Sequence, residues 1–303
     1  MIKYTLGILI TLYACNICLA QQKQDTLYQR LDKVPVFGLS YFNYGNSDFE
    51  SPIGTGEAKM QEMGAMFQYI KQLKNKKWLL ANKLLYTYFK YDAKSAFNGF
   101  DINENFHSIS YSLGVIRILP KRWKLIVLLS PTLASDFQES LSRNDLISQG
   151  SIIATKRASP YFEYGFGLTY TTRFGNPTVL PLVNLTYKKG DWHTKAVLPA
   201  YITHYYVFNE NTKLGFRVAA YGNLYNATIE NNSTAFELNR VGYSRINIGP
   251  DFQTKLFRDF YMNLGAGIST RNVLEIQDDD LNTIIDVDVD EKFFFNIGVK
   301  LLK

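Results

Sequence analysis

The sequence predicts an all-β protein, a transmembrane antiparallel up-and-down β-barrel of about 14 strands, with 12 as the smaller alternative. Three observations predict it. Apolar and polar residues alternate along most of the chain. The alternating segments reach about ten residues, enough for a tilted strand to cross a bilayer. Tight turns also alternate with longer polar loops, as in outer-membrane barrels.

The first twenty residues (1–20) are predicted to be a cleaved signal peptide. A positive charge precedes an apolar run over residues 4–14, and small residues, Cys18 and Ala20, occupy the −3 and −1 positions. This run is too short for a spanning helix, which needs roughly 20 apolar residues. A lipid anchor on Cys15 is the alternative, although the residues before it match a lipoprotein signal only loosely.

After the signal peptide we expect a short periplasmic lead-in over residues 21–32 and a single barrel domain over residues 33–303. No later stretch contains 18 consecutive apolar residues, so the exported chain is predicted to carry no membrane helix. These features predict an outer-membrane location. A secreted β-sandwich remains the soluble alternative.

The strands are placed by alternation with a period of two. Between residues 161 and 174, Phe162, Tyr164, Phe166 and Leu168 share one face, and the glycines between them share the other. Fourteen strands are expected near residues 33–44, 60–72, 77–91, 106–119, 122–137, 147–157, 160–174, 178–188, 191–198, 200–208, 213–228, 237–256, 260–276 and 284–302. Merging segment 147–157 or the hairpin at Pro199 into its neighbours would give 12. An even number places both ends of the barrel domain on the same, periplasmic side.

Four tight turns are each followed by an aromatic residue. Trp78, Trp123, Trp192 and Tyr261 follow short polar turns. Amphipathic aromatic rings gather at the headgroup level of membranes. We therefore predict that these four lie at the periplasmic membrane interface, with ordinary hairpin turns and core aromatics as the alternative.

The polar faces of the strands are expected to line the lumen, and these faces are rich in basic residues. The predicted basic lining is Arg173, Lys195, Lys213, Arg217, Arg245, Lys255, Arg271 and Lys300. The predicted acidic lining is Glu62, Glu163 and Asp251. Rings of Arg or Lys serve anion pores, so one reading is a passive pore or binding protein for small anionic or polar solutes. The other is a structural or partner-binding barrel without transport, whose interior is closed by ion pairs and packed tyrosines, because barrels of 12 to 14 strands lie between filled and open sizes.

One acidic segment is a candidate metal site. Asp286, Asp288 and Asp290 alternate with apolar residues, so their carboxylates share a strand face and could bind Ca²⁺ or Mg²⁺. A solvated acidic rim is the alternative. No other pattern indicates a cofactor, and none is expected.

The sequence offers little support for an enzyme. His107 precedes two serines, but strand alternation places both on the opposite face. His193 and His204 lie among aromatic residues and are expected in the interface rings. An outer-membrane lipid hydrolase is the weaker hypothesis from another class. The net charge of +6 is spread along the chain, which argues against nucleic-acid binding.

Residues 181–192, 243–249 and 265–271 resemble a family of uncharacterised outer-membrane β-barrel proteins of Gram-negative envelopes. The resemblance implies the barrel fold and an outer-membrane address, without an assigned activity. The partners to expect are outer-membrane lipid, the assembly machinery and a small anionic solute, with the chain as a monomer. Many outer-membrane proteins end on an aromatic residue that the machinery recognises, whereas this sequence ends Leu301-Leu302-Lys303.

Overall fold

The computed structural model describes residues 33–303, except residues 53, 76, 96–101 and 228–238. The signal peptide and lead-in predicted for residues 1–32 lie outside the described residues. Among the described residues, no helix is long and apolar enough to cross a membrane.

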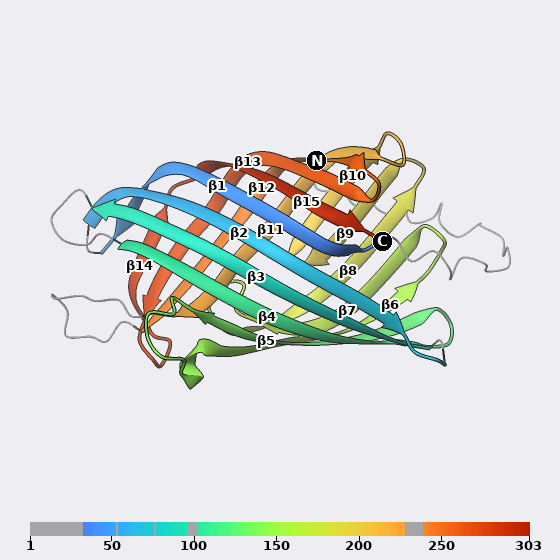
Figure 1. Cartoon of the computed structure of the whole chain (residues 1–303), viewed down its shortest axis with the longest axis horizontal. Helices are drawn as coiled ribbons and strands as arrows, with labels where there is room; N and C mark the ends of the chain where they lie inside the picture. The colour runs from blue at the N-terminus through green and yellow to red at the C-terminus, as the bar shows by residue number, and fades with distance from the viewer. Residues whose placement is uncertain (1–32, 53, 76, 96–101, 228–238) are drawn as a thin grey trace, which may run out of the picture. The chain divides into compact units, whose positions relative to one another are not determined.

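The described chain forms one antiparallel β-barrel, as the alternation predicted (Figure 1). Its strands are β1 (Pro35–Ser51), β2 (Gly54–Gln72), β3 (Trp78–Ser95), β4 (Ile102–Ile118), β5 (Trp123–Ser135), β6 (Leu146–Arg157), β7 (Phe162–Thr171), β8 (Thr178–Lys189), β9 (Trp192–Leu198), β10 (Tyr201–Val207), β11 (Thr212–Asn226), β12 (Arg240–Phe257), β13 (Phe260–Gln277), β14 (Thr283–Val289) and β15 (Lys292–Leu302). Each strand from β1 to β13 pairs with the next, and β15 closes the barrel by pairing with β13 and β1. Because β14 and β15 share the last place between β13 and β1, the barrel has fourteen strand positions, which confirms the larger predicted count.

Several strands extend beyond the predicted bounds. Residues 47–51 and 54–58, which lie between two of the predicted strands, instead continue the β1–β2 ladder to its turn. A register shift between Tyr44 and Ser47 accompanies this extension. The apolar-to-polar change in the sequence therefore marks a change in surroundings along a strand, rather than the end of the strand.

The two ends of the barrel differ. At one end, which we call the turn end, short turns join β2 to β3, β4 to β5 and the later pairs through β12 to β13, and the start of β1 lies beside the end of β15. There the backbone N–H of Val34 donates to the carbonyl of Lys303 at 2.8 Å. The opposite end, the loop end, carries the longer connections β3–β4, β5–β6 and β11–β12.

Alternation assigns the two faces of each strand. On β7, Phe166 and Leu168 face outward and are 60% and 53% exposed, whereas Gly165 and Gly167 face inward. An added Cβ at Gly167 would lie 2.1 Å from the carbonyl oxygen of Ile152, so only glycine fits there. Small inward residues thus allow β6 and β7 to pair closely while large apolar side chains cover the outside.

The outward apolar residues form a band around the turn-end half of the barrel. On β3 this band runs from Leu80 to Tyr88, and the outward positions beyond it are Lys90, Asp92 and Lys94. At about 3.3 Å per residue and a tilt near 40°, this stretch rises roughly 20 Å. That approaches the band of about 25 Å found on barrels that span an outer membrane.

The barrel narrows toward the loop end because its strands are of unequal length. Strands β9 and β10 have 7 residues each and stop short of that end. On the loop-end side of β9 and β10, the end of β5 pairs with the end of β11. There the backbone N–H of Asp136 donates to the carbonyl of Asn226 at 3.2 Å. This direct β5–β11 contact bypasses the intervening strands and brings opposite walls together.

Candidate functional site

The interior of the barrel is crossed by one connected group of side chains. We call Tyr44, Glu62, Phe89, Tyr243 and Arg245 the cross-barrel cluster. The guanidinium of Arg245 forms an ion pair with Glu62 and donates from Nε to the Tyr44 hydroxyl at 2.8 Å. The Tyr243 hydroxyl donates to the same Glu62 carboxylate at 3.0 Å. Tyr44, Glu62 and Phe89 come from β1–β3 and the others from β12, so the cluster spans the interior between walls that are separated by the β13 and β14/β15 positions.

Aromatic rings enclose this ion pair. The rings of Phe89 and Tyr243 stack with centroids 4.0 Å apart, and the Arg245 guanidinium lies 4.4 Å from the centre of the Tyr44 ring. Arg245 is 1% exposed, and its Nη1 has no hydrogen-bond partner among the described residues, so Glu62 is the acid that compensates its charge. Ring contacts of this kind stabilise a desolvated cation by about 2 kcal/mol.

A second layer of rings continues the packing toward the loop end. Phe106 of β4 lies 4.9 Å from Tyr225 of β11, again across the interior. Phe89, Phe106 and Tyr225 are all 1% exposed or less. The interior is therefore densely packed with side chains in the loop-end half.

The turn-end half of the interior is different, because it holds several cations and few free acids. Asp251 accepts a hydrogen bond from the Tyr205 hydroxyl at 2.5 Å and another from Asn263. Glu163 is engaged by Lys124 at 2.8 Å. Arg217 carries a buried Nε that has no hydrogen-bond partner among the described residues. These contacts connect neighbouring parts of the wall and do not reach across the barrel.

Register places most of the predicted lining residues on the inward face. Besides those already located, inward positions are occupied by Lys195, Lys213, Lys255 and Lys300. Lys195 remains exposed in spite of its inward position, so solvent reaches the interior at this height. Lys213 lies 4.2 Å from the centre of the Tyr205 ring.

Two predicted lining residues do not join this group. Strand β7 ends at Thr171, so Arg173 belongs to the β7–β8 loop, where it donates to the Ala220 carbonyl at 2.9 Å. Arg271 lies at a bulge with φ of 51°, is exposed, and packs 5.8 Å from the Phe174 ring. Strict alternation assigned both to the lumen, and a strand end and a bulge break that alternation.

The aromatic residues predicted at the membrane interface divide in a similar way. Trp78, Trp123 and Trp192 face outward at the turn end, and Trp192 stacks on His204 at 4.8 Å. A cationic side chain lies over each of the other two tryptophan rings. The guanidinium of Arg117 is 5.0 Å from the centre of the Trp78 ring. Tyr261 was placed wrongly, because it pairs with Lys255 on the inward face and is 5% exposed.

The structure does not gather the predicted metal ligands into a site. Asp286, Asp288 and Asp290 follow each other along the outer wall, and the first two are successive outward positions on β14. Such positions lie about 7 Å apart along a strand. Among the described residues, no group of three His, Cys, Asp or Glu side chains is arranged to hold a metal ion.

The histidines face away from the serines that suggested a hydrolase. Nδ1 of His107 lies 2.8 Å from the Tyr86 hydroxyl on the outer wall, while Ser110 faces inward and contacts Thr132. Nδ1 of His204 lies 2.8 Å from Thr194, also outward. His193 occupies an inward position opposite Tyr205.

Sequence reasoning located Arg245 and Glu62 but missed their aromatic partners. Tyr44, Phe89 and Tyr243 are single rings in long aromatic-rich strands. Their inward positions could have been read from the alternation. Their mutual contact could not, because it depends on how the walls approach each other.

Comparison with known proteins gives a family, without an activity. No curated protein matches the chain. An outer-membrane channel from Pseudomonas putida F1 has a TM-score of 0.47 at 8% identity, covering 93% of this chain and 100% of that chain. The toluene transporter TodX of Pseudomonas putida scores 0.41 at 15% identity, covering 88% of each chain. The translocator domain of the Neisseria meningitidis autotransporter NalP scores 0.40 at 9% identity, covering 89% of each chain. A family model matches residues 23–301, and the chain therefore belongs to the family described as a domain of unknown function, DUF6268.

Proposed function

We propose that this protein is an outer-membrane barrel that takes small anionic or polar solutes into its turn-end interior and passes them only when the cross-barrel cluster opens. In this arrangement the turn end faces the periplasm and the loop end faces the outside. The outward apolar band supports the membrane location, since its height approaches the hydrocarbon thickness that such barrels span.

The preference for anions rests on the excess of cations on the inner wall. Lys195, Lys213, Lys255 and Lys300 face inward there. The nearby acid Asp251 already accepts hydrogen bonds from two side chains. The observation that carries the proposal is Arg217, whose buried Nε donor has no partner and is suited to an anionic acceptor.

The proposed closed resting state depends on the contacts within the cross-barrel cluster. A solute that traverses the interior has to pass between walls held together by Arg245, Glu62 and the ring stack of Phe89 and Tyr243. Opening requires this group to separate. We therefore expect low conductance in the wild type, interrupted by brief openings.

Single-channel recording in a planar bilayer tests both parts. The reversal potential in a salt gradient should show a preference for anions, and Arg217→Gln should reduce it because one interior positive charge is lost. Lys156→Gln is the matched control, because Lys156 faces outward over Trp123 at the turn end. Equal selectivity for cations and anions in the wild type would contradict the proposal.

The second candidate is a permanently closed barrel without transport. The dense packing of Phe89, Phe106 and Tyr225 favours it. The variant Glu62→Gln separates the two, since it removes the ion pair that closes the interior. A folded barrel that conducts neither as wild type nor as this variant would favour the closed barrel.

A further inference from the structure

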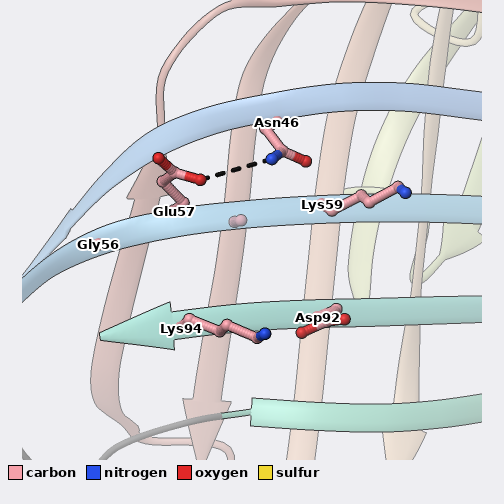
Figure 2. Close-up of a pocket in the computed structure, with 7 residues that line it drawn as sticks. Asn46, Gly56, Glu57, Lys59, Asp92 and Lys94 are labelled. Carbon is pink, nitrogen blue, oxygen red and sulfur yellow. Dashed lines mark hydrogen bonds between the residues drawn. The ribbon is translucent and has the colours of Figure 1, made fainter. Parts of the chain in front are cut away.

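The outer wall of β2 and β3 carries a group of charged side chains next to the apolar band on its loop-end side. We call Lys59, Lys90, Asp92 and Lys94 the outer-wall lysine site. Figure 2 shows Lys59, Asp92 and Lys94 standing on the two adjacent strands. In the ladder Lys59 is directly opposite Asp92, so that Lys90 and Lys94 are its diagonal neighbours. Lys94 is in turn directly opposite Glu57, so three cations and two carboxylates share this face of the sheet.

These cations have no ion-pair partner within the part of the chain that the structure describes. No carboxylate there lies within 4.0 Å of the Lys59, Lys90 or Lys94 ammonium groups. The nearby Glu57 instead accepts a hydrogen bond from Asn46 at 3.4 Å. The lysines are therefore available to an external anion.

The surface between these side chains is hollowed. A pocket of about 480 Å³ is lined by Lys59, Asp92 and Lys94 together with residues of β1 and β2 (Figure 2). A smaller one of about 70 Å³ shares Lys59 and Asp92 and adds Gln61 and Lys90. Because they share Lys59 and Asp92, the two hollows adjoin on the outer wall of β2 and β3, and we call them together the track.

The residues at the lower end of this track belong to the membrane boundary. Met63 and Tyr88, the next outward positions after Gln61 and Lys90, face each other across the β2–β3 ladder. Met63 is 47% exposed, and the Tyr88 hydroxyl donates to Asn105 at 2.6 Å. A lipid lying along this wall would place its chains on the apolar residues and its headgroup on the lysines.

We propose that the outer-wall lysine site binds the phosphorylated headgroup of an acylated glycolipid in the outer leaflet. Ammonium groups bind phosphate oxygens through charge-assisted hydrogen bonds. The acyl chains explain why a lipid, rather than a free phosphate, occupies a site that opens onto the apolar band. The outer wall of β13 and β14 at the same end carries Glu275, Asp286 and Asp288, so it does not offer the same charge.

This inference rests on the proposed membrane placement. A failure of that placement would appear separately, as a barrel that stays in solution without detergent. A failure of the proposed transport would appear in bilayer recordings, which do not involve the outer wall.

The test measures binding of diphosphoryl lipid A to the detergent-solubilised protein by native mass spectrometry. The variant Lys59→Gln/Lys90→Gln/Lys94→Gln should bind it at least about tenfold more weakly, because each lysine that is replaced removes one electrostatic attraction to the anionic lipid. The control Lys71→Gln/Lys74→Gln/Lys77→Gln removes the same charge from exposed lysines at the turn end of the same hairpin. It should bind as the wild type does.

Two further probes identify what the site recognises. Dephosphorylated lipid A should bind the wild type as weakly as diphosphoryl lipid A binds the outer-wall variant. Inorganic pyrophosphate should compete only at much higher concentration, since it lacks the chains. Equal losses in the two lysine variants, or no loss in either, would overturn the proposal. Pyrophosphate that competes as well as the lipid would overturn the choice of a lipid ligand.

Discussion

Glu62→Gln is the most informative single change, because Arg245 is almost fully buried and Glu62 carries the negative charge that compensates it. The substitution keeps the shape of the side chain and removes its charge. It weakens two contacts at once, the ion pair with Arg245 and the hydrogen bond from Tyr243. Removing one partner of a buried ion pair costs about 3–5 kcal/mol, because the remaining charge stays uncompensated.

The free energy of unfolding should therefore fall by about 3–5 kcal/mol in Glu62→Gln. Guanidinium titration of the refolded barrel in lipid vesicles, followed by tryptophan fluorescence, measures it. The matched control is Glu57→Gln on the same strand, since Glu57 faces outward and is exposed. Its unfolding free energy should stay within about 0.5 kcal/mol of the wild type.

A double variant checks the physical reason. Glu62→Leu/Arg245→Met removes both charges, so it should recover most of the stability that Glu62→Gln loses. A loss below about 1 kcal/mol in Glu62→Gln would refute the reasoning, because an exposed pair contributes no more than that. The same result would remove the reason to assign closure of the barrel to this ion pair.

Two further predictions concern packing. Phe89→Ala removes a fully buried ring that stacks on Tyr243, so the free energy of unfolding should fall by about 3–5 kcal/mol and openings should become more frequent. A stability equal to the wild type would show that the stack contributes nothing. Gly167→Ala places a Cβ 2.1 Å from the Ile152 carbonyl oxygen and should cost about 1–3 kcal/mol. Gly45→Ala, whose Cβ would lie 3.8 Å from its nearest neighbour, should be tolerated, and equal unfolding midpoints for the two variants would contradict this account.

The fold class followed from the sequence because alternation with a period of two is a local property. Phe166 and Leu168 face outward and the glycines between them face inward, as the pattern predicted. The count of fourteen followed for the same reason, since each hairpin carries its own turn residues. The polar continuation of β1 and β2 was missed because composition marks the edge of the apolar band and not the end of a ladder.

The errors in the candidate site concern residues whose observed face of the strand differs from the face that the sequence predicted. Arg271 left the predicted face because a bulge shifts the alternation by one residue. Tyr261 was taken for an interface ring because it follows a turn, yet its pairing with Lys255 turns it inward. Both positions depend on hydrogen-bond register, which a single strand sequence does not specify.

The sequence by itself determined the strands, their two faces and the positive charge of the interior, because each depends on neighbours within a few residues. Only the tertiary structure decided that the cross-barrel cluster spans the interior. Arg245 meets Glu62 from a position 183 residues away in the chain, and the walls approach because β5 joins β11 above the short strands β9 and β10. That closure follows from unequal strand lengths around a closed ladder, a property of the whole barrel that no single segment contains.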